Sequence, residues 1–221
     1  MKQRITILFA SGLLALTQFG VATAGPLEDG QVAYGRGMVA FGRHDYAAAL
    51  RLWQPLANQG NVMAEDALGY MYEKGYGVLQ SDATAAIWYR KAADDGDSDA
   101  QNSLGAMYEN GRGEPQDYAL AAMWYRKAAD RGNATAQKNL GRFYENGRGV
   151  PQDYVLAHMW FNLAASGFTI FTETHDEAVS ARDELTAKMT PSQIAEAQRM
   201  AREWLQKCQS ESLLGWCPSH P

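Results

Sequence analysis

The middle of the chain repeats itself with a period of 36 residues. Trp88, Trp124 and Trp160 lie at this spacing, and eleven further columns are identical in all three copies. Twelve matches at one fixed offset predict an array of stacked units rather than a single globular core. One unit of this length cannot bury its apolar face alone, so the copies are expected to pack against one another.

The identical columns fall into two halves, each with the spacing of a helix. In the first copy Ala64, Leu68 and Tyr72 lie at i, i+4 and i+8, on one face of a first helix. Ala85 and Ala92 lie seven residues apart, on one face of a second helix. Each copy is therefore predicted to be a pair of helices.

A loop with a G-x-G motif joins the two halves, at residues 75–77 in the first copy. Pro115 and Pro151 lie in the later loops, where they cannot interrupt a helix. The predicted N-cap residues of the second helices are Ser81, Asp117 and Asp153. A divergent unit precedes the three copies, with an offset of 35 or 36 residues. Its residues Gly42, Trp53, Ala57 and Gly60 match Gly77, Trp88, Ala92 and Gly96.

The motif A-x-x-x-L-G-x-M-Y-E-x-G-x-G-V-x-Q-D, followed by A-x-x-W-Y-x-K-A-A-x-x-G, strongly resembles the Sel-one-like repeat, a relative of the tetratricopeptide repeat. Residues 102–132 come close to a consensus copy, and the resemblance covers about residues 30–167. It implies an all-α fold, an α/α superhelical solenoid whose first helices line the concave side.

The repeat ends near residue 167, and the C-terminal segment is predicted to cap the solenoid. Residues 173–189 have the apolar pattern of an amphipathic helix. Thr190, Pro191 and Gln193 match the N-cap, N1 and N3 positions of a second helix, expected over residues 191–207. The predicted organisation is a signal peptide 1–24, a divergent repeat 25–60, repeats 61–96, 97–132 and 133–167, and a cap with its tail, 168–221.

The two cysteines, Cys208 and Cys217, both lie near the C-terminus. In an oxidising compartment, an isolated pair this close in sequence is expected to form a disulfide that closes the tail. A redox or metal-binding pair is the alternative. The spacing differs from C-x-x-C, however, and no cluster of His and Cys accompanies the pair.

The N-terminus has the features of a secretory signal peptide. Lys2 and Arg4 precede an apolar run over residues 5–16, and Ala22 and Ala24 form an A-x-A cleavage site. The apolar run is shorter than the ~20 residues of a membrane span, which disfavours the alternative of an uncleaved anchor. Cleavage after Ala24 takes the net charge from −5 to −7, because both basic residues are lost. The location is expected to be the periplasm or the exterior, and an acidic chain is a poor ligand for nucleic acid.

Residues that could carry chemistry show no catalytic, metal-binding or cofactor-binding pattern. The G-x-G motifs recur with the repeat and lack the preceding strand of a nucleotide site. His158 replaces an alanine on a second helix, which favours a packing or surface role. Glu73, Glu109 and Glu145 occur once in each copy, which indicates a structural bond at the helix end rather than acid–base work.

One stripe on the first helices changes identity from copy to copy and lies on a face distinct from the constant residues. Its residues are Asp66, Asn102 and Lys138; Tyr70, Ala106 and Arg142; and Lys74, Asn110 and Asn146. Variable residues on the inner helices are free to bind a partner, or are simply solvated. The stripe changes from acidic at Asp66 to basic at Lys138 and Arg142. This gradient predicts a groove whose C-terminal end accepts an acidic or polar segment.

These features favour a non-enzymatic adaptor that binds another protein in the periplasm through the concave face of the solenoid. An immunity protein that neutralises a toxin is an alternative binding function. Some cysteine-rich relatives are β-lactamases, but those have a disulfide in each repeat, and the repeats here contain no cysteine.

Mass spectrometry of the exported protein tests the two predictions about the chain ends. Signal cleavage leaves 197 of the 221 residues, so the first residue is expected to be Gly25. The disulfide predicts that iodoacetamide labels neither cysteine until the protein is reduced. A mature chain that still contains Met1, or alkylation without reduction, would contradict the corresponding prediction.

Overall fold

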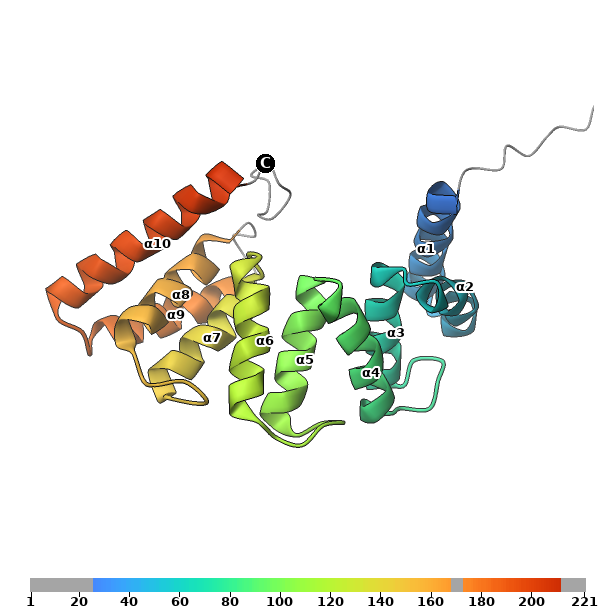
Figure 1. The fold of residues 1–221 in the computed structure, drawn as a ribbon, viewed down its shortest axis with the longest axis horizontal. Coiled ribbons are helices and arrows are strands. Elements are labelled where there is room, and N and C mark those ends of the chain that lie inside the picture. The colour runs from blue at the N-terminus through green and yellow to red at the C-terminus, as the bar shows by residue number, and fades with distance from the viewer. Residues whose placement is uncertain (1–25, 168–172, 212–221) are drawn as a thin grey trace, which may run out of the picture.

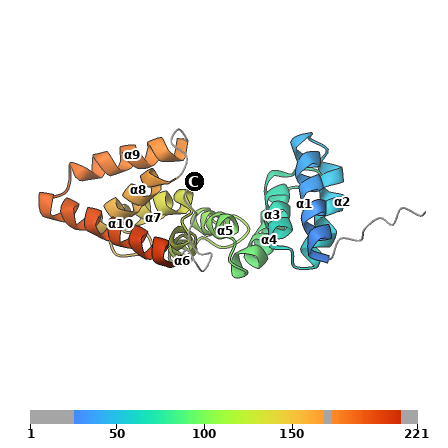
Figure 2. The same ribbon diagram turned by 90° about the horizontal axis from the view of Figure 1, so that it is seen from above.

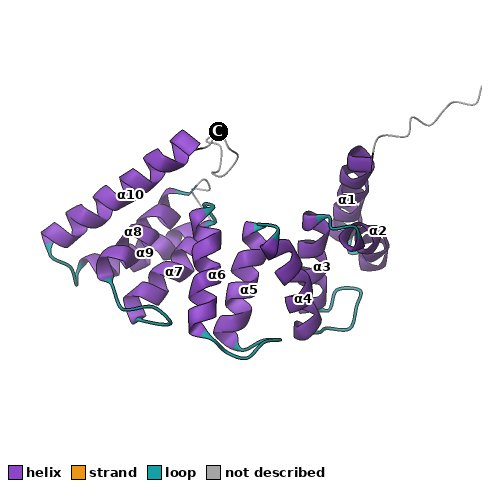
Figure 3. Ribbon diagram, in the orientation of Figure 1, coloured by secondary structure: helices purple, strands orange, loops and turns teal. Residues whose placement is uncertain are grey.

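The computed structural model describes residues 26–167 and 173–211, and every regular element in these ranges is an α-helix (Figure 1, Figure 3). The helices are α1 (Pro26–Gly42), α2 (Tyr46–Asn58), α3 (Val62–Lys74), α4 (Asp82–Asp94), α5 (Ser98–Asn110), α6 (Tyr118–Asp130), α7 (Ala134–Asn146), α8 (Tyr154–Ser166), α9 (Glu173–Thr186) and α10 (Pro191–Glu211). The all-α solenoid predicted from the repeat is confirmed. The predicted signal peptide and the tail from residue 212 lie outside the described residues.

Consecutive helices pack as hairpins that follow one another along the long axis of the molecule (Figure 2). The helices α1 and α2 lie at one end, and α9 and α10 lie at the other. First helices also meet across the intervening second helix, since α3 contacts α5 and α7 contacts α9. This places the first helices on the inner side of the curve, as expected for a solenoid.

The second helices keep the 36-residue register through all four units, because α2, α4, α6 and α8 begin at residues 46, 82, 118 and 154. Trp53 therefore occupies the position of Tyr89 rather than that of Trp88, and Ala57 that of Ala93 rather than that of Ala92. The sequence alignment of the divergent unit was wrong by one residue at both positions. The indole of Trp53 is buried and donates a hydrogen bond from Nε1 to the carbonyl oxygen of Tyr34, at 3.1 Å.

An aromatic ring of each second helix lies directly on a glycine of the first helix. A Cβ atom built at Gly105 would come within 2.8 Å of the ring of Tyr125, closer than atoms can approach without displacement. The same contact recurs in the other units, between Gly37 and Trp53, Gly69 and Tyr89, and Gly141 and Phe161. The constant glycine column is therefore a packing requirement, because the ring occupies the space of a side chain.

The loops between the helices behave as the sequence predicts. The side chains of Ser81, Asp117 and Asp153 each accept a hydrogen bond from a backbone N–H in the first turn of α4, α6 and α8. Gly75 ends α3 with a φ of 72°, in the left-handed region that glycine enters without strain. Gly111 and Gly147 end α5 and α7 in the same conformation.

The repeated glutamates form the structural bonds predicted for them. Tyr89 donates its hydroxyl to Glu73 at 2.8 Å, and Tyr125 donates to Glu109 at 2.7 Å. The third unit has Phe161 at this position, so its glutamate lacks that donor. These bonds tie the end of each first helix to its second helix.

Arginines of the following loop join neighbouring units through the same glutamates. Arg112 donates to Glu73 at 3.1 Å, and Arg148 pairs with Glu109 at 3.6 Å. For the last unit, Lys188 from the α9–α10 connection donates to Glu145 at 3.0 Å. Burial alone would raise the pKa of Glu73, but hydrogen bonds from Lys74, Tyr89 and Arg112 lower it.

The two C-terminal helices cap the array by packing against α8. Ala178 and Leu185 of α9 and Ala197 and Ala201 of α10 are fully buried. The predicted capping box is present, because the Thr190 backbone N–H donates to the Gln193 side chain and the Gln193 backbone N–H donates to the Thr190 hydroxyl. The helices α9 and α10 pack on α8 rather than mainly against each other, unlike the hairpin of a repeat.

The surface of α8 explains where α10 binds. Leu163 of α8 occupies the register position of Lys91 in α4 and Lys127 in α6. Met159 likewise corresponds to the exposed Met123, yet Met159 and Leu163 are both buried. Apolar residues thus replace solvated ones on the last repeat helix, where a capping helix is needed.

Three sequence-based expectations concern residues of this C-terminal region. His158 is buried in α8, which confirms the packing role over a surface one. Cys208 is buried near the end of α10, but Cys217 lies outside the described residues, so the disulfide stays a prediction. Within residues 26–167 and 173–211, no helix combines the length and the hydropathy that a membrane crossing requires.

One buried position of the first helices is a glutamate in α3 and a glutamine in α5 and α7. Gln101 donates from Nε2 to the carbonyl oxygen of Ala93 at 2.9 Å, and Gln137 bonds the equivalent carbonyl of the next unit. Glu65 occupies this column in α3. An ionised carboxylate cannot donate, and its Oε2 is buried without a hydrogen-bond partner. Burial accordingly raises the pKa of Glu65 above its usual 4.5.

Glu65→Gln is expected to stabilise the protein by about 1 kcal/mol at pH 7, because the amide can donate to the carbonyl oxygen of Ala57. A raised pKa in the folded state means that Glu65 stabilises the fold only at low pH, so the gain should shrink as the pH falls from 7 toward 4.5 and be smallest below 4.5. Urea denaturation at several pH values measures this. The reverse change, Gln101→Glu, should destabilise the protein at pH 7, and a neutral effect of both would contradict the explanation.

Candidate functional site

The predicted partner-binding stripe lies on the inner face of the first helices, on the open side of the solenoid. On α3, α5 and α7 one side packs on the second helix of the same unit, and another packs on the preceding unit. The stripe lies on neither of these sides. Tyr70 is 40% exposed, and Lys74, Asn110, Arg142 and Asn146 are also exposed. Asp66, Asn102 and Lys138 are half-buried beside the neighbouring first helix.

At the N-terminal end of this face, Tyr70 belongs to an aromatic cluster. Its ring centre lies 6.1 Å from that of Phe41 and 5.8 Å from that of Tyr76. Tyr76 in turn stacks on Tyr46 at 4.7 Å, with nearly parallel rings. The ammonium of Lys74 lies 5.7 Å from the centre of the Tyr70 ring. Tyr70 therefore presents one edge of a rigid aromatic surface to solvent.

Asp66 faces other acidic residues at the joint between α3 and α5. Burial, followed by the negative charges of Asp97, Asp99 and Glu73, raises its pKa to about 7. Asp97 caps the start of α5, and Asp99 accepts a hydrogen bond from the side chain of Asn133 at 2.8 Å. The joint between these two units thus concentrates negative charge on the inner face.

At the C-terminal end, Lys138 is used within the chain. Its ammonium pairs with Glu177 of α9, and its side chain is only 13% exposed. The expected basic end of the groove is therefore partly neutralised by the cap. The pairing of Lys138 leaves Arg142 as the stripe's exposed cation on α7.

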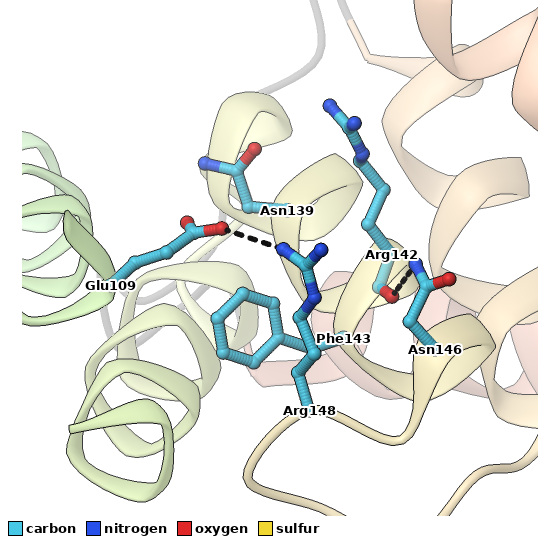
Figure 4. A pocket seen from close by; sticks show the side chains of 6 residues that line it. All are labelled: Glu109, Asn139, Arg142, Phe143, Asn146 and Arg148. Atoms are coloured by element: carbon cyan, nitrogen blue, oxygen red, sulfur yellow. Dashed lines mark hydrogen bonds and ion pairs between the residues drawn. The ribbon is translucent and has the colours of Figure 1, made fainter. Parts of the chain in front are cut away.

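Arg142 lies between two hollows. One, of about 120 Å³, is lined by Glu109, Asn139, Arg142, Phe143, Asn146 and Arg148 (Figure 4). The other, of about 380 Å³, lies between α7 and α9 and shares Arg142 and Asn146 with the first. In Figure 4 the guanidinium of Arg142 extends away from the Glu109–Arg148 pair. No ion pair or hydrogen bond of this guanidinium is formed with the described residues.

The amide side chains of the stripe are fixed by local bonds. Asn110 and Asn146 donate to the backbone carbonyl four residues earlier, at 2.8 Å in both cases. Asn102 accepts a hydrogen bond from Asn139 of α7 at 3.3 Å. Each amide oxygen of Asn110 and Asn146 remains an available acceptor on the inner face.

Several residues of this surface were missed by sequence reasoning. Phe41 and Tyr76 extend the aromatic surface, and Arg148 and Asn139 line the smaller hollow. Glu177 could not be found as the partner of Lys138, because α9 lies outside the repeat and has no counterpart for comparison. The G-x-G loop residue Arg148 recurs as Arg112, which was a usable signal for a role at the joint between units.

The family model of the Sel1 repeat matches residues 29–61, 62–97, 98–133 and 134–167. The chain belongs to the Sel1 repeat family. Sel1 repeats generally mediate protein–protein interaction, and the family is generally a non-enzymatic interaction module. No curated protein sequence matches the chain. Within the described ranges, no group of three His, Cys, Asp or Glu side chains could hold a metal ion.

Two solved structures of Sel1 repeat proteins are similar to this one. A Sel1 repeat protein from Oxalobacter formigenes has a TM-score of 0.61 and 31% identity, over 68% of this chain and 57% of that one. A protective antigen of uropathogenic Escherichia coli with an SLR fold has a TM-score of 0.57 and 27% identity, over 80% of this chain and 46% of that one. The Sel1 chain described here thus spans about half the length of these two proteins.

Asp66 makes the stability of this Sel1 protein depend on pH. Because the folded state raises the pKa from 3.8 to about 7, Asp66 favours folding at acidic pH, and this contribution is lost as the pH rises through 7. Asp66→Asn should therefore raise the urea midpoint at pH 8 and change it little at pH 4. Asp94→Asn, at an exposed site on α4, serves as the control. Equal effects of the Asp66 change at both pH values would contradict the assignment.

Proposed function

We propose that this protein is an exported adaptor that binds a segment of another protein along the concave face of its Sel1 repeats. The observation that carries the proposal is the exposed guanidinium of Arg142, which lies between two hollows of the inner face. The cations around it are paired, Lys138 with Glu177, Arg148 with Glu109 and Lys188 with Glu145. Arg142 is the cation available for a partner at this place, and the exposed carboxylate of Glu184 lines the larger hollow beside it.

The chemistry of the two ends suggests the kind of segment that binds. Arg142 suits a carboxylate, and the free amide oxygens beside it suit backbone N–H groups of an extended chain. The aromatic surface at Tyr70 suits an apolar or cationic side chain. Because Asp97 and Asp99 add negative charge near Asp66 at the joint between α3 and α5, a segment with its acidic end toward α7 is favoured over the reverse orientation.

Export is supported by the N-terminal sequence and by the predicted disulfide. A charged start, a short apolar run and an A-x-A site form a secretory signal, and two close cysteines suit an oxidising compartment. The neighbour from uropathogenic Escherichia coli is a protective antigen, which fits an exported protein. The periplasm is the proposed place of action.

The two alternative functions, a toxin-neutralising immunity protein and a β-lactamase, are tested by different experiments. An immunity protein would restore growth when it is expressed together with a toxin whose activity it neutralises. A β-lactamase would hydrolyse nitrocefin. No cysteine occurs in the four repeats, and β-lactamase activity is therefore the less favoured of the two.

Crosslinking in the intact periplasm, followed by mass spectrometry, identifies the partner, and its affinity is then measured with the purified proteins. Combining Tyr70→Ala with Arg142→Glu should weaken binding by at least about tenfold, or ~1.4 kcal/mol. Lys138 is left unchanged, because its pairing with Glu177 makes it a structural residue.

The matched control is Arg202→Glu, which reverses an exposed charge on α10, away from the inner face. It should leave the affinity unchanged. The control should unfold at the same urea concentration as the natural chain, and the double variant at a slightly lower one, because the Tyr70 ring packs on Phe41 and Tyr76. The affinities are therefore measured without urea, where both variants are folded. Unchanged affinity of the Tyr70 and Arg142 double variant would overturn the assignment of the concave face.

A further inference from the structure

The outer face of α1 forms the N-terminal end of the solenoid and has no neighbour among the described helices. Figures 1 and 2 show α1 and α2 at the end of the array opposite to the capping helices. Val32 is 52% exposed and Val39 is 54% exposed, on the same side of α1. Two large apolar side chains seven residues apart form a stripe along this helix.

The register of the repeats shows that this face is a stacking surface. Gly37 contacts Trp53 as Gly69 contacts Tyr89, so α1 aligns with α3 at an offset of 32 residues. At that offset Val32 corresponds to Ala64 of α3. The same alignment places Val39 at the position of Met71. In α3 both of these residues are completely buried, in a cluster with residues of α2 from the preceding unit.

The same burial holds at every later joint between units. Ala100 and Ala136, at the position of Val32, are completely buried. Met107 and Phe143, at the position of Val39, are 2% exposed. A second helix of the preceding unit covers these residues each time. Within residues 26–167 and 173–211, only the first unit presents this surface without the helix that covers it in the later units.

Two further residues of α1 differ from their counterparts in the later units, and the first of them, Arg36, indicates what would cover the face. Arg36 occupies the position of the buried Leu68, and its side chain forms no ion pair or hydrogen bond with the described residues. Gly35 lies in the interior of α1, where glycine weakens a helix. A Cβ atom built there would meet nothing within 4 Å, so no contact inside the chain requires a glycine.

We infer that the outer face of α1 is a second docking surface, which takes an amphipathic helix of a partner protein. The helix binds as the second helix of a missing preceding unit, with apolar side chains on Val32 and Val39. A carboxylate of the partner helix pairs with Arg36, because the leucine of the other joints is here a cation. This surface is separate from the concave face and does not depend on the function proposed for it.

A second copy of the chain is the less suitable occupant. The outer side of α9, at the other end, has the exposed residues Asp176, Ser180 and Asp183 and offers no apolar stripe for Val32 and Val39. Two α1 faces placed together would oppose two Arg36 side chains. A foreign helix with apolar residues on both sides of an acidic one avoids both conflicts.

Site-specific photocrosslinking in the native cells tests the docking surface. A benzophenone amino acid replaces Val39 in the full chain, and the same probe at Gln198, on the exposed side of α10, is the control. The Val39 probe should give an adduct whose partner peptide is a helix with an acidic residue between apolar ones. Arg36→Glu should remove the adduct, and replacing the partner's acidic residue by Lys should restore it. Arg142→Glu should leave it unchanged, which separates this surface from the concave face.

Gly35→Ala provides a control on the same helix. In the isolated protein it should raise the thermal midpoint, because alanine favours a helix and the added methyl group meets no atom. In cells the same variant should leave the Val39 adduct unchanged, because Ala67, Ser103 and Asn139 carry a Cβ atom at this position in the covered joints. No adduct at Val39, an adduct with a second copy of this chain, or an adduct that persists in Arg36→Glu would each overturn the proposal.

Discussion

The contact between an aromatic ring and a helix backbone determines the spacing within every unit of this solenoid. Where Tyr125 lies on Gly105, the two helices of a hairpin approach more closely than any side chain at residue 105 would permit. The ring also places the Tyr125 hydroxyl against Glu109, which receives Arg148 from the next loop. One packing contact thus leads to the hydrogen bond that closes a unit and to the ion pair that joins it to the next.

The two ends of the solenoid differ in whether their stacking surface is covered. At the C-terminus, α8 has Leu163 where α4 and α6 have lysine, and this leucine is buried in a cluster with residues of α10. At the N-terminus, the stacking surface of α1 remains open, with an arginine in the middle of it. The capping helices thus cover the stacking surface at one end of the solenoid, whereas the stacking surface at the other end remains accessible to a partner. The inner face is likewise unequal, with acidic and aromatic residues near α3 and an exposed arginine on α7.

Most of the fold could be predicted from the sequence, because the constant columns report directly on packing. The glycine column, the N-caps at Ser81, Asp117 and Asp153, and the capping box at Thr190 depend only on local spacing. The position of Trp53 could not be read correctly, since tryptophan there matched the Trp88 column by residue type while the register required Tyr89. The candidate site was predictable in its location, through the variable stripe. Its chemistry was not, because Lys138 meets Glu177 from a helix that has no counterpart in the repeat.

Phe161 stands where the two preceding units have a tyrosine, and this difference limits where further repeats can be added to the solenoid. In the earlier units a tyrosine hydroxyl serves the glutamate at the end of the first helix, whereas Glu145 relies on Lys188 of the α9–α10 connection. The last unit and the cap are therefore chemically matched to each other. A duplicated repeat inserted before residue 133 would keep each glutamate of this column with a tyrosine or lysine donor. Insertion after residue 167 would separate Glu145 from Lys188, so growth of the array by duplication is restricted to positions upstream of the final unit.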